Sequence, residues 1–190
     1  MPIESWFQTP IYYTSVDNID KVTQEINSAI QITKTTQPWG DSVRTSFVYN
    51  KKNDFCKHTP SLEKNIIENA QRFCQGLGMP DTLIEIAESW INFTGKDEYQ
   101  NYHSHIPYDI SGVYYHQTTN NGKDGVISFK DPCQIRSYSK LLKTQAPTVQ
   151  HNAEKGKLIL FPSFLEHAVL YNQTDIERIS ISFNLNILNH

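Results

Sequence analysis

The sequence has little cysteine, and its three cysteines form no recognisable pair. Cys56, Cys74 and Cys133 are odd in number and widely spaced, and none belongs to a Cys-x-x-Cys motif. Disulfide frameworks use paired cysteines, and zinc sites built on cysteine use closely spaced ones. The sequence therefore indicates neither. It fits a reducing compartment, and we expect a cytoplasmic protein.

Long apolar runs and dense positive charge are also missing. The longest apolar run, at 158–161, is far shorter than the roughly 20 residues that cross a bilayer, and the first residues do not resemble a secretory signal. The net charge is −3, and the few lysines and arginines are scattered. We therefore expect no membrane segment and no nucleic-acid partner.

Two amphipathic helices are predicted in the first part of the chain. One runs from Asn18 or Ile19 to Ile32; the other begins at Thr59-Pro60, a capping residue followed by proline, and ends at Gly78. Apolar residues recur at helical spacing in both. They are Ile19, Val22, Ile26 and Ile30 in the first helix, and Leu62, Ile66, Ala70, Phe73 and Leu77 in the second.

From about residue 83 the apolar period changes from 3.6 to 2, which predicts strands. We expect them at 84–93, 110–116, 125–129, 157–161 and 178–187, with weaker candidates around Val149 and at 168–171. A length of 190 residues suits a single domain, 1–190. Its fold class would be α+β, with mainly helical support over 1–82 and a sandwich or barrel over 83–190.

The strand predicted at 178–187 alternates strictly between polar and apolar residues. Its polar row is Arg178, Ser180, Ser182, Asn184 and Asn186; its apolar row is Ile179, Ile181, Phe183, Leu185 and Ile187. A sheet with one solvated face would show this pattern. A barrel that holds a polar ligand, with its apolar face against helices, would show it too.

Three of the seven histidines are spaced for metal binding. His103 and His105 are two residues apart, so on extended chain both imidazoles can face one ion, and His167 follows the strand predicted at 157–161. Such a three-ligand face leaves coordination positions open, whereas structural zinc usually takes a fourth protein ligand. Arg178 lies on the next strand, where its guanidinium can pair with a carboxylate bound at the same metal, and Ser180 can add a hydrogen bond.

Five blocks of sequence together resemble a known family. They are Tyr102-His-Ser-His, Ile110-Ser-Gly-Val-Tyr-Tyr, Gly156-Lys-Leu-Ile-Leu-Phe-Pro-Ser, His167 and Arg178-Ile-Ser-Ile-Ser-Phe-Asn. In this order they resemble the iron(II)/2-oxoglutarate-dependent oxygenases. They are most similar to a bacterial and phage group with HxHP, SGVYY, LFPS-H and RxSxSFN blocks. The resemblance covers Trp90 to Asn186.

This resemblance implies a double-stranded β-helix, a jelly-roll core over 83–190 that carries the metal site and is buttressed by the N-terminal helices. It implies Fe(II) bound by His103 and His167, with 2-oxoglutarate held by Arg178 and Ser180. Tyr115 and Ser111 share one face of their strand and would also contact the cosubstrate.

His105 departs from the wider superfamily, which has Asp or Glu two residues after the first histidine. We expect His105 to be the third ligand. Asp109 is the nearest carboxylate and is the alternative, although its spacing does not match.

The expected activity is that of a dioxygenase, by default a hydroxylase, that consumes dioxygen and 2-oxoglutarate and acts on a small molecule or a peptide. His103, His105, His167 and Arg178 would be its catalytic residues. One rival is a cupin-like dioxygenase with three histidines and no 2-oxoglutarate; another is a jelly-roll binding module without activity. Association as a homodimer is left open.

Overall fold

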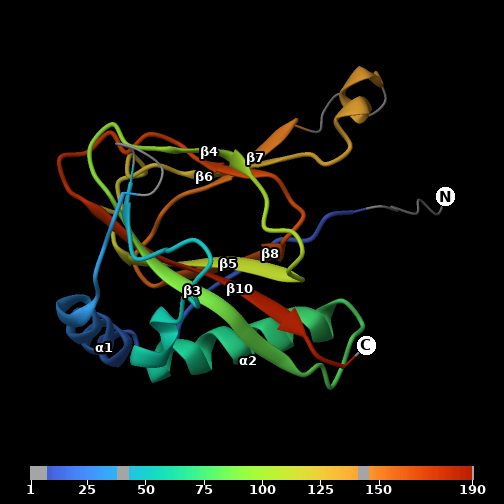
Figure 1. The fold of residues 1–190 in the computed structure, drawn as a ribbon. Helices are drawn as coiled ribbons and strands as arrows, with labels where there is room; N and C mark the ends of the chain where they lie inside the picture. Colours follow the sequence, from blue (N-terminus) through green and yellow to red (C-terminus); the bar gives the residue numbers. More distant parts are fainter. Residues whose placement is uncertain (1–7, 38–42, 141–145, 190) are drawn as a thin grey trace.

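Two antiparallel β-sheets face each other in the computed structural model, which describes residues 8–37, 43–140 and 146–189 (Figure 1). The larger sheet has the strand order β1-β8-β5-β10-β3-β2, and the smaller has the order β4-β9-β6-β7. The larger sheet contains β1 (Tyr12–Ser15), β2 (Arg44–Thr45), β3 (Ile84–Thr94), β5 (Ile110–Gln117), β8 (Lys157–Pro162) and β10 (Arg178–Ile187). The smaller sheet contains β4 (Gln100–His103), β6 (Ile127–Lys130), β7 (Thr148–His151) and β9 (His167–Val169).

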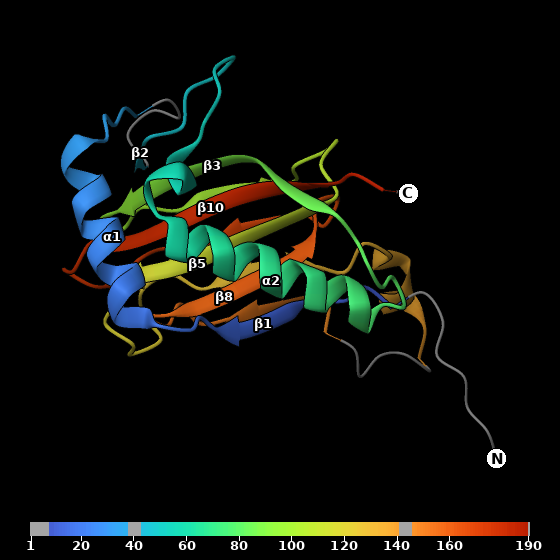
Figure 2. The same ribbon diagram turned by 90° about the horizontal axis from the view of Figure 1, so that it is seen from below.

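The helices α1 (Ile19–Ile32) and α2 (Pro60–Gly76) lie on the outer face of the larger sheet (Figure 2). Short 3₁₀ helices occur at Phe55–His58 and Gln134–Tyr138. Val22 and Ile26 of α1, together with Leu62 and Ile66 of α2, belong to the core cluster that also contains apolar residues of the sheet. Amphipathic periodicity therefore predicted both helices and the face that each one buries.

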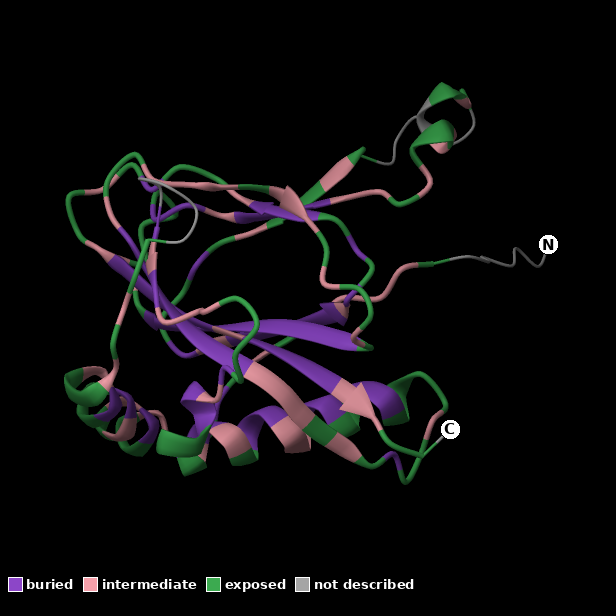
Figure 3. Cartoon of the chain, viewed as in Figure 1, coloured by how far each residue is buried: buried purple, intermediate pink, exposed green. Residues whose placement is uncertain are grey.

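The predicted apolar face of α2 is wrong at its last residue. Leu77 follows the helix and is 51% exposed, whereas Phe73, four residues earlier, is buried. In Figure 3 the buried residues of α2 follow the side that meets the sheet. The apolar spacing of the sequence thus continues to Leu77, whereas the buried face of the helix ends before it.

Thr59 does not cap α2 as the sequence suggested. Its Oγ1 donates a hydrogen bond to the Cys56 carbonyl, and no side-chain cap bond forms. Glu25 of α1 takes over this role, because its carboxylate accepts hydrogen bonds from both the backbone N–H and the hydroxyl of Ser61, each 2.7 Å long. A carboxylate at a helix N-terminus is favoured both by the free N–H groups and by the helix dipole. The cap thus ties the two helices together.

The alternation of β10 separates the helix layer from the space between the sheets. Ile179, Ile181, Phe183 and Leu185 all lie in the core cluster shared with the helices. Side chains at alternate positions point to the opposite face, so Arg178, Ser180, Ser182 and Asn184 face the smaller sheet. The solvated-face interpretation is therefore wrong for this strand. Gly112 of β5 makes room for Phe183, since a Cβ atom at this position would overlap the Phe183 ring.

The five main predicted strands are present, and the two weaker candidates correspond to β7 and β9. Three short strands were not predicted. β1 pairs with β8, β2 with β3, and β4, which pairs with β9, ends at His103. The architecture is the expected α+β double-stranded β-helix. None of the helices in the described ranges is both long and apolar enough to cross a membrane.

Truncating Ile66 and Leu77 tests this packing. Ile66→Ala should lower the free energy of unfolding by about 2–5 kcal/mol, because Ile66 is fully buried between α2 and the sheet. Leu77→Ala should change it by less than about 1 kcal/mol, since this side chain is largely exposed. Urea unfolding measures both; equal losses would contradict the placement of α2.

Candidate metal centre

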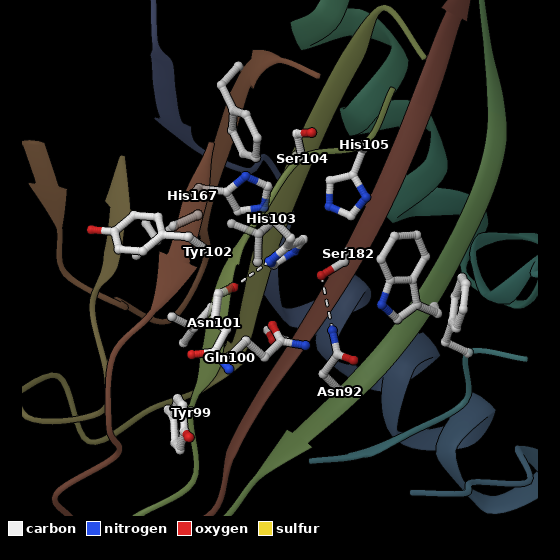
Figure 4. Close-up of a pocket in the computed structure, with 18 of the residues that line it drawn as sticks. Asn92, Tyr99, Gln100, Asn101, Tyr102, His103, Ser104, His105, His167 and Ser182 are labelled. Atoms are coloured by element: carbon white, nitrogen blue, oxygen red, sulfur yellow. Dashed lines mark hydrogen bonds between the residues drawn. The ribbon is translucent and has the colours of Figure 1, made fainter. Parts of the chain in front are cut away.

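Three histidine side chains meet between the sheets, as predicted. His103 ends β4 and is paired with His167, the first residue of β9. His105 lies two residues after His103, and its backbone N–H donates a 2.9 Å hydrogen bond to the carbonyl of Ser163, which follows β8. One nitrogen from each ring lies within 4.8 Å of the other two. Figure 4 shows the three rings gathered at one point.

The hydrogen bonds of His103 and His167 fix which ring nitrogen is free. His103 Nδ1 lies 2.7 Å from the Asn101 carbonyl oxygen, and His167 Nδ1 lies 3.0 Å from that of Leu165. A carbonyl oxygen only accepts, so both Nδ1 atoms carry the proton and both Nε2 atoms present a lone pair. Metal-binding histidines are commonly oriented in this way.

Burial keeps the three imidazoles uncharged. Burial, together with the neighbouring His103, lowers the pKa of His167 to about 3 and that of His105 to about 4. The pKa of His103 is lowered as well, chiefly by burial. At neutral pH each ring is therefore a neutral ligand, the form that binds a metal.

Asp109, the alternative third ligand, lies elsewhere. Its Oδ2 accepts a 2.7 Å hydrogen bond from the backbone N–H of Ile187, at the far end of β10. Among the described residues, the group of side chains placed to hold a metal consists of the three histidines alone. The geometry therefore favours His105 over Asp109.

Arg178 is buried in the same cavity and forms no ion pair with a described residue, although the carboxylates of Asp124 and Glu98 act on it from a longer distance. Its Nη1 donates to the carbonyl oxygens of Gly125 at 2.8 Å and Asp124 at 3.2 Å, and its Nη2 donates to Thr94 Oγ1 at 2.8 Å. Its Nε has no partner among the described residues, and none of their ion pairs includes it. An unpaired buried cation is costly, so this arrangement fits an anionic ligand that occupies the cavity and accepts from Nε–H.

Ser180 and Tyr115 lie beside Arg178, paired across β10 and β5, and both line the cavity. Burial raises the pKa of Tyr115 to about 12, so its hydroxyl stays protonated and can donate. Ser111 shares the strand face of Tyr115 but is not among the lining residues. Its hydroxyl is 2.7 Å from Ser163 Oγ and donates to Asn184 Oδ1. The placement gives no support to the predicted contact between Ser111 and the cosubstrate.

The cavity has a volume of about 590 Å³ and includes residues that the sequence did not single out. Glu88, Trp90 and Asn92 line it from β3, and Gln100 and Asn101 line it from β4. For the three residues of β3, the sequence does show a regular alternation. It does not show which face of β3 turns inward, because that depends on the pairing of β3 with β10.

Comparison with known proteins agrees with this fold. Residues 88–184 match the family described as "Putative 2OG-Fe(II) oxygenase". The match spans just over half of the chain, and the chain belongs to this family of oxidoreductases. No curated protein matches its sequence.

Solved structures share the fold at low sequence identity. A Pseudomonas putida prolyl-4-hydroxylase is 11% identical, with a TM-score of 0.62 over 95% of this chain and 94% of the other. HygX from Streptomyces hygroscopicus, solved with nickel and 2-oxoglutarate, is 10% identical, with a TM-score of 0.64 over 94% and 83%. A 2OG-Fe(II) oxygenase family oxidoreductase from Burkholderia pseudomallei is 15% identical, with a TM-score of 0.61 over 86% and 77%.

Replacing His167 tests the metal centre. His167→Ala should weaken Fe(II) binding by more than the roughly 10–100-fold typical of losing a residue that only orients a ligand. His58→Ala is the matched control, since His58 is exposed and lies outside the cavity. Anaerobic titration with metal analysis measures both. Equal iron content in the two variants would remove His167 from the site.

Proposed function

We propose that the chain binds Fe(II) through His103, His105 and His167 and binds 2-oxoglutarate through Arg178, and that it hydroxylates an organic substrate. The observation that carries the proposal is the buried guanidinium of Arg178, which has a free Nε–H in the same cavity as three neutral histidines. When bound, iron and 2-oxoglutarate supply the oxidising chemistry. Dioxygen and 2-oxoglutarate are consumed, succinate and carbon dioxide are released, and one oxygen atom enters a C–H bond of the substrate.

The three histidines give this site an unusual charge balance. Each is neutral, whereas a carboxylate at position 105 would bring a negative charge to the metal. One carboxylate of the cosubstrate would pair with Arg178, so the carboxylate at the metal would offset only one of the two charges of Fe(II). A site of this kind should depend strongly on 2-oxoglutarate to keep its metal.

Arg178 would hold the carboxylate of the cosubstrate that lies away from the metal. Its two Nη1 contacts to main-chain carbonyls and its Nη2 contact to Thr94 fix the plane of the guanidinium. Nε–H would then be left as a donor for a ligand carboxylate. The hydroxyls of Ser180 and Tyr115 lie in the same part of the cavity and would complete the polar surface around that carboxylate.

Neither of the two rival functions explains both the buried Arg178 and the three histidines. A three-histidine dioxygenase that does not use 2-oxoglutarate would leave Arg178 buried without an anion. A binding module without activity that uses neither metal nor anion would give no reason for three neutral histidines and a buried Arg178 to share one cavity. The substrate class, a cytoplasmic location, the absence of nucleic-acid or membrane partners and association as a homodimer stay predictions.

Replacing Arg178 tests the cosubstrate site. Arg178→Gln should weaken 2-oxoglutarate binding roughly 10- to 150-fold, because a hydrogen bond between charged groups contributes about 1.5–3 kcal/mol, and should leave Fe(II) bound. The measurement is an anaerobic titration of the iron-loaded protein with 2-oxoglutarate, followed by the visible metal-to-ligand charge-transfer band.

The control is Arg44→Gln, which breaks a half-exposed ion pair with Glu177 outside the cavity and should leave the titration unchanged. Wild-type affinity in a folded Arg178→Gln protein would place the cosubstrate elsewhere. A wild-type protein that holds iron and shows no band would overturn the proposed function.

A further inference from the structure

The cavity continues past the metal centre, on the side away from Arg178. Strand register sets the order, because β10 pairs with β3 as Arg178↔Thr94, Ser180↔Asn92, Ser182↔Trp90 and Asn184↔Glu88. The ring of His105 lies 5.8 Å from that of Trp90, so the histidines sit opposite the third of these pairs. Glu88 is one pair further along, about 7 Å at roughly 3.3–3.4 Å per residue. Arg178 and Glu88 therefore occupy opposite ends of one cavity.

Glu88 brings a carboxylate into the cavity that forms no ion pair with any cation in the described part of the chain. Asn184 Nδ2 donates to its Oε1 at 2.7 Å, and Asn53 Nδ2 donates to its Oε2 at 3.4 Å. Both partners are neutral. None of the ion pairs among the described residues includes Glu88.

The Glu88 carboxylate is held in a fixed position relative to the metal centre. Asn184 is fully buried, and its Oδ1 accepts a hydrogen bond from Ser111, whose hydroxyl is also in contact with that of Ser163. The carbonyl of Ser163 accepts the backbone N–H of His105. One hydrogen-bonded series thus connects the carboxylate to a metal ligand. This gives Ser111 a structural role at this end of the cavity.

Aromatic rings line the cavity beside Glu88. Phe47 lies 5.2 Å from Trp90 and 5.1 Å from Tyr49, both in edge arrangements, and all three residues line the cavity. Aromatic faces attract cations and pack against alkyl chains. A carboxylate beside such a wall suits an ammonium or guanidinium group on an aliphatic arm.

Asn92 adds a second acceptor on the same strand face. Its Nδ2 donates to Ser182 Oγ at 3.0 Å, as drawn in Figure 4, while its Oδ1 has no partner among the described residues. The side chain is only 3% exposed and lines the cavity. A buried acceptor without a donor is costly, so its partner is expected to come from a bound molecule. Asn92 pairs with Ser180, on the Arg178 side of the histidines, so this acceptor is separate from the carboxylate of Glu88.

We propose that the substrate carries a positively charged nitrogen, an ammonium or a guanidinium at the end of a short alkyl arm, and that this group pairs with Glu88. The carbon to be oxidised then lies on that arm, a few bonds from the nitrogen, where it faces the histidines. This inference rests on the proposed function. Such an arm occurs in free amines and amino acids and in lysine or arginine side chains of peptides.

Binding of simple probes to the anaerobic Fe(II)/2-oxoglutarate complex of the full chain tests the proposal. The probes are n-butylammonium, n-butylguanidinium and, as a neutral analogue, n-pentanol, measured by calorimetry and by the shift of the charge-transfer band. At least one cation should bind about tenfold more tightly than the alcohol. L-Lysine, L-arginine and end-blocked glycyl-lysyl-glycine and glycyl-arginyl-glycine then distinguish free amino acids from peptides as the source of the arm.

Variants of β3 locate the cation. Glu88→Gln should weaken its binding about tenfold or more, and Glu88→Asp, which keeps the charge, should retain the preference over the alcohol. Glu85→Gln is the matched control on the same strand, because Glu85 is exposed, outside the cavity and bonded to Asn186. It should change cation binding by less than about twofold. Thermal unfolding verifies that each variant is folded.

The charge-transfer band separates the two levels of failure. If the band never forms in iron-loaded protein, the proposed function fails. If the band forms but neither cation binds, or the cations bind no better than the alcohol, or folded Glu88→Gln binds them as the wild type does, the inference about the substrate fails alone.

Discussion

Burial of the apolar face of β10 against the helices decides which way its polar side chains point. Ile181 and Phe183 are fully buried in the helix-side cluster, so the intervening residues must face the smaller sheet. A shift of one residue in register would exchange the two faces, placing Arg178 among the helices and Phe183 beside the histidines. The hydrophobic layer therefore specifies the position of the polar site, and α1 and α2 contribute to it without touching it.

Charge is distributed along the cavity in a definite order. A guanidinium lies at one end, three neutral imidazoles occupy the middle and a carboxylate lies at the other end, each held by hydrogen bonds to neutral groups. No ion pair between described residues involves Arg178 or Glu88, although the carboxylates of Asp124 and Glu98 act on Arg178 from a longer distance. A site of this kind is built for ligands that bring the opposite charges with them.

Helices and strands that are long could be predicted from the periodicity of their apolar residues. The helix at 19–32 and the strands at 110–117 and 178–187 contain enough residues for their apolar pattern to be read without knowledge of their partners. The histidines and Arg178 could be found because residue type, spacing and the resemblance agreed. β1, β2 and β4 are too short for a pattern, since two to four residues form a strand only when a longer neighbour offers its edge.

Residues whose role depends on tertiary pairing could not be predicted from the sequence for a related reason. Glu88 and Asn92 face the cavity because of the register between β3 and β10, and Glu25 caps α2 across a gap of 36 residues. Ser111 was assigned by its strand face alone, which says which way a side chain points and nothing about which neighbour takes its hydroxyl. Local sequence determines the direction of a side chain far better than its partner.

The acceptors that orient His103 and His167 belong to the main chain, at positions 101 and 165. A carbonyl is supplied by any amino acid, so the orientation of these rings is independent of the side chains at those two positions. Asn101 is exposed and lines the cavity, so a change there would alter what the cavity accepts while His103 keeps its orientation. Selection for a new substrate can therefore act at this position without rebuilding the metal site.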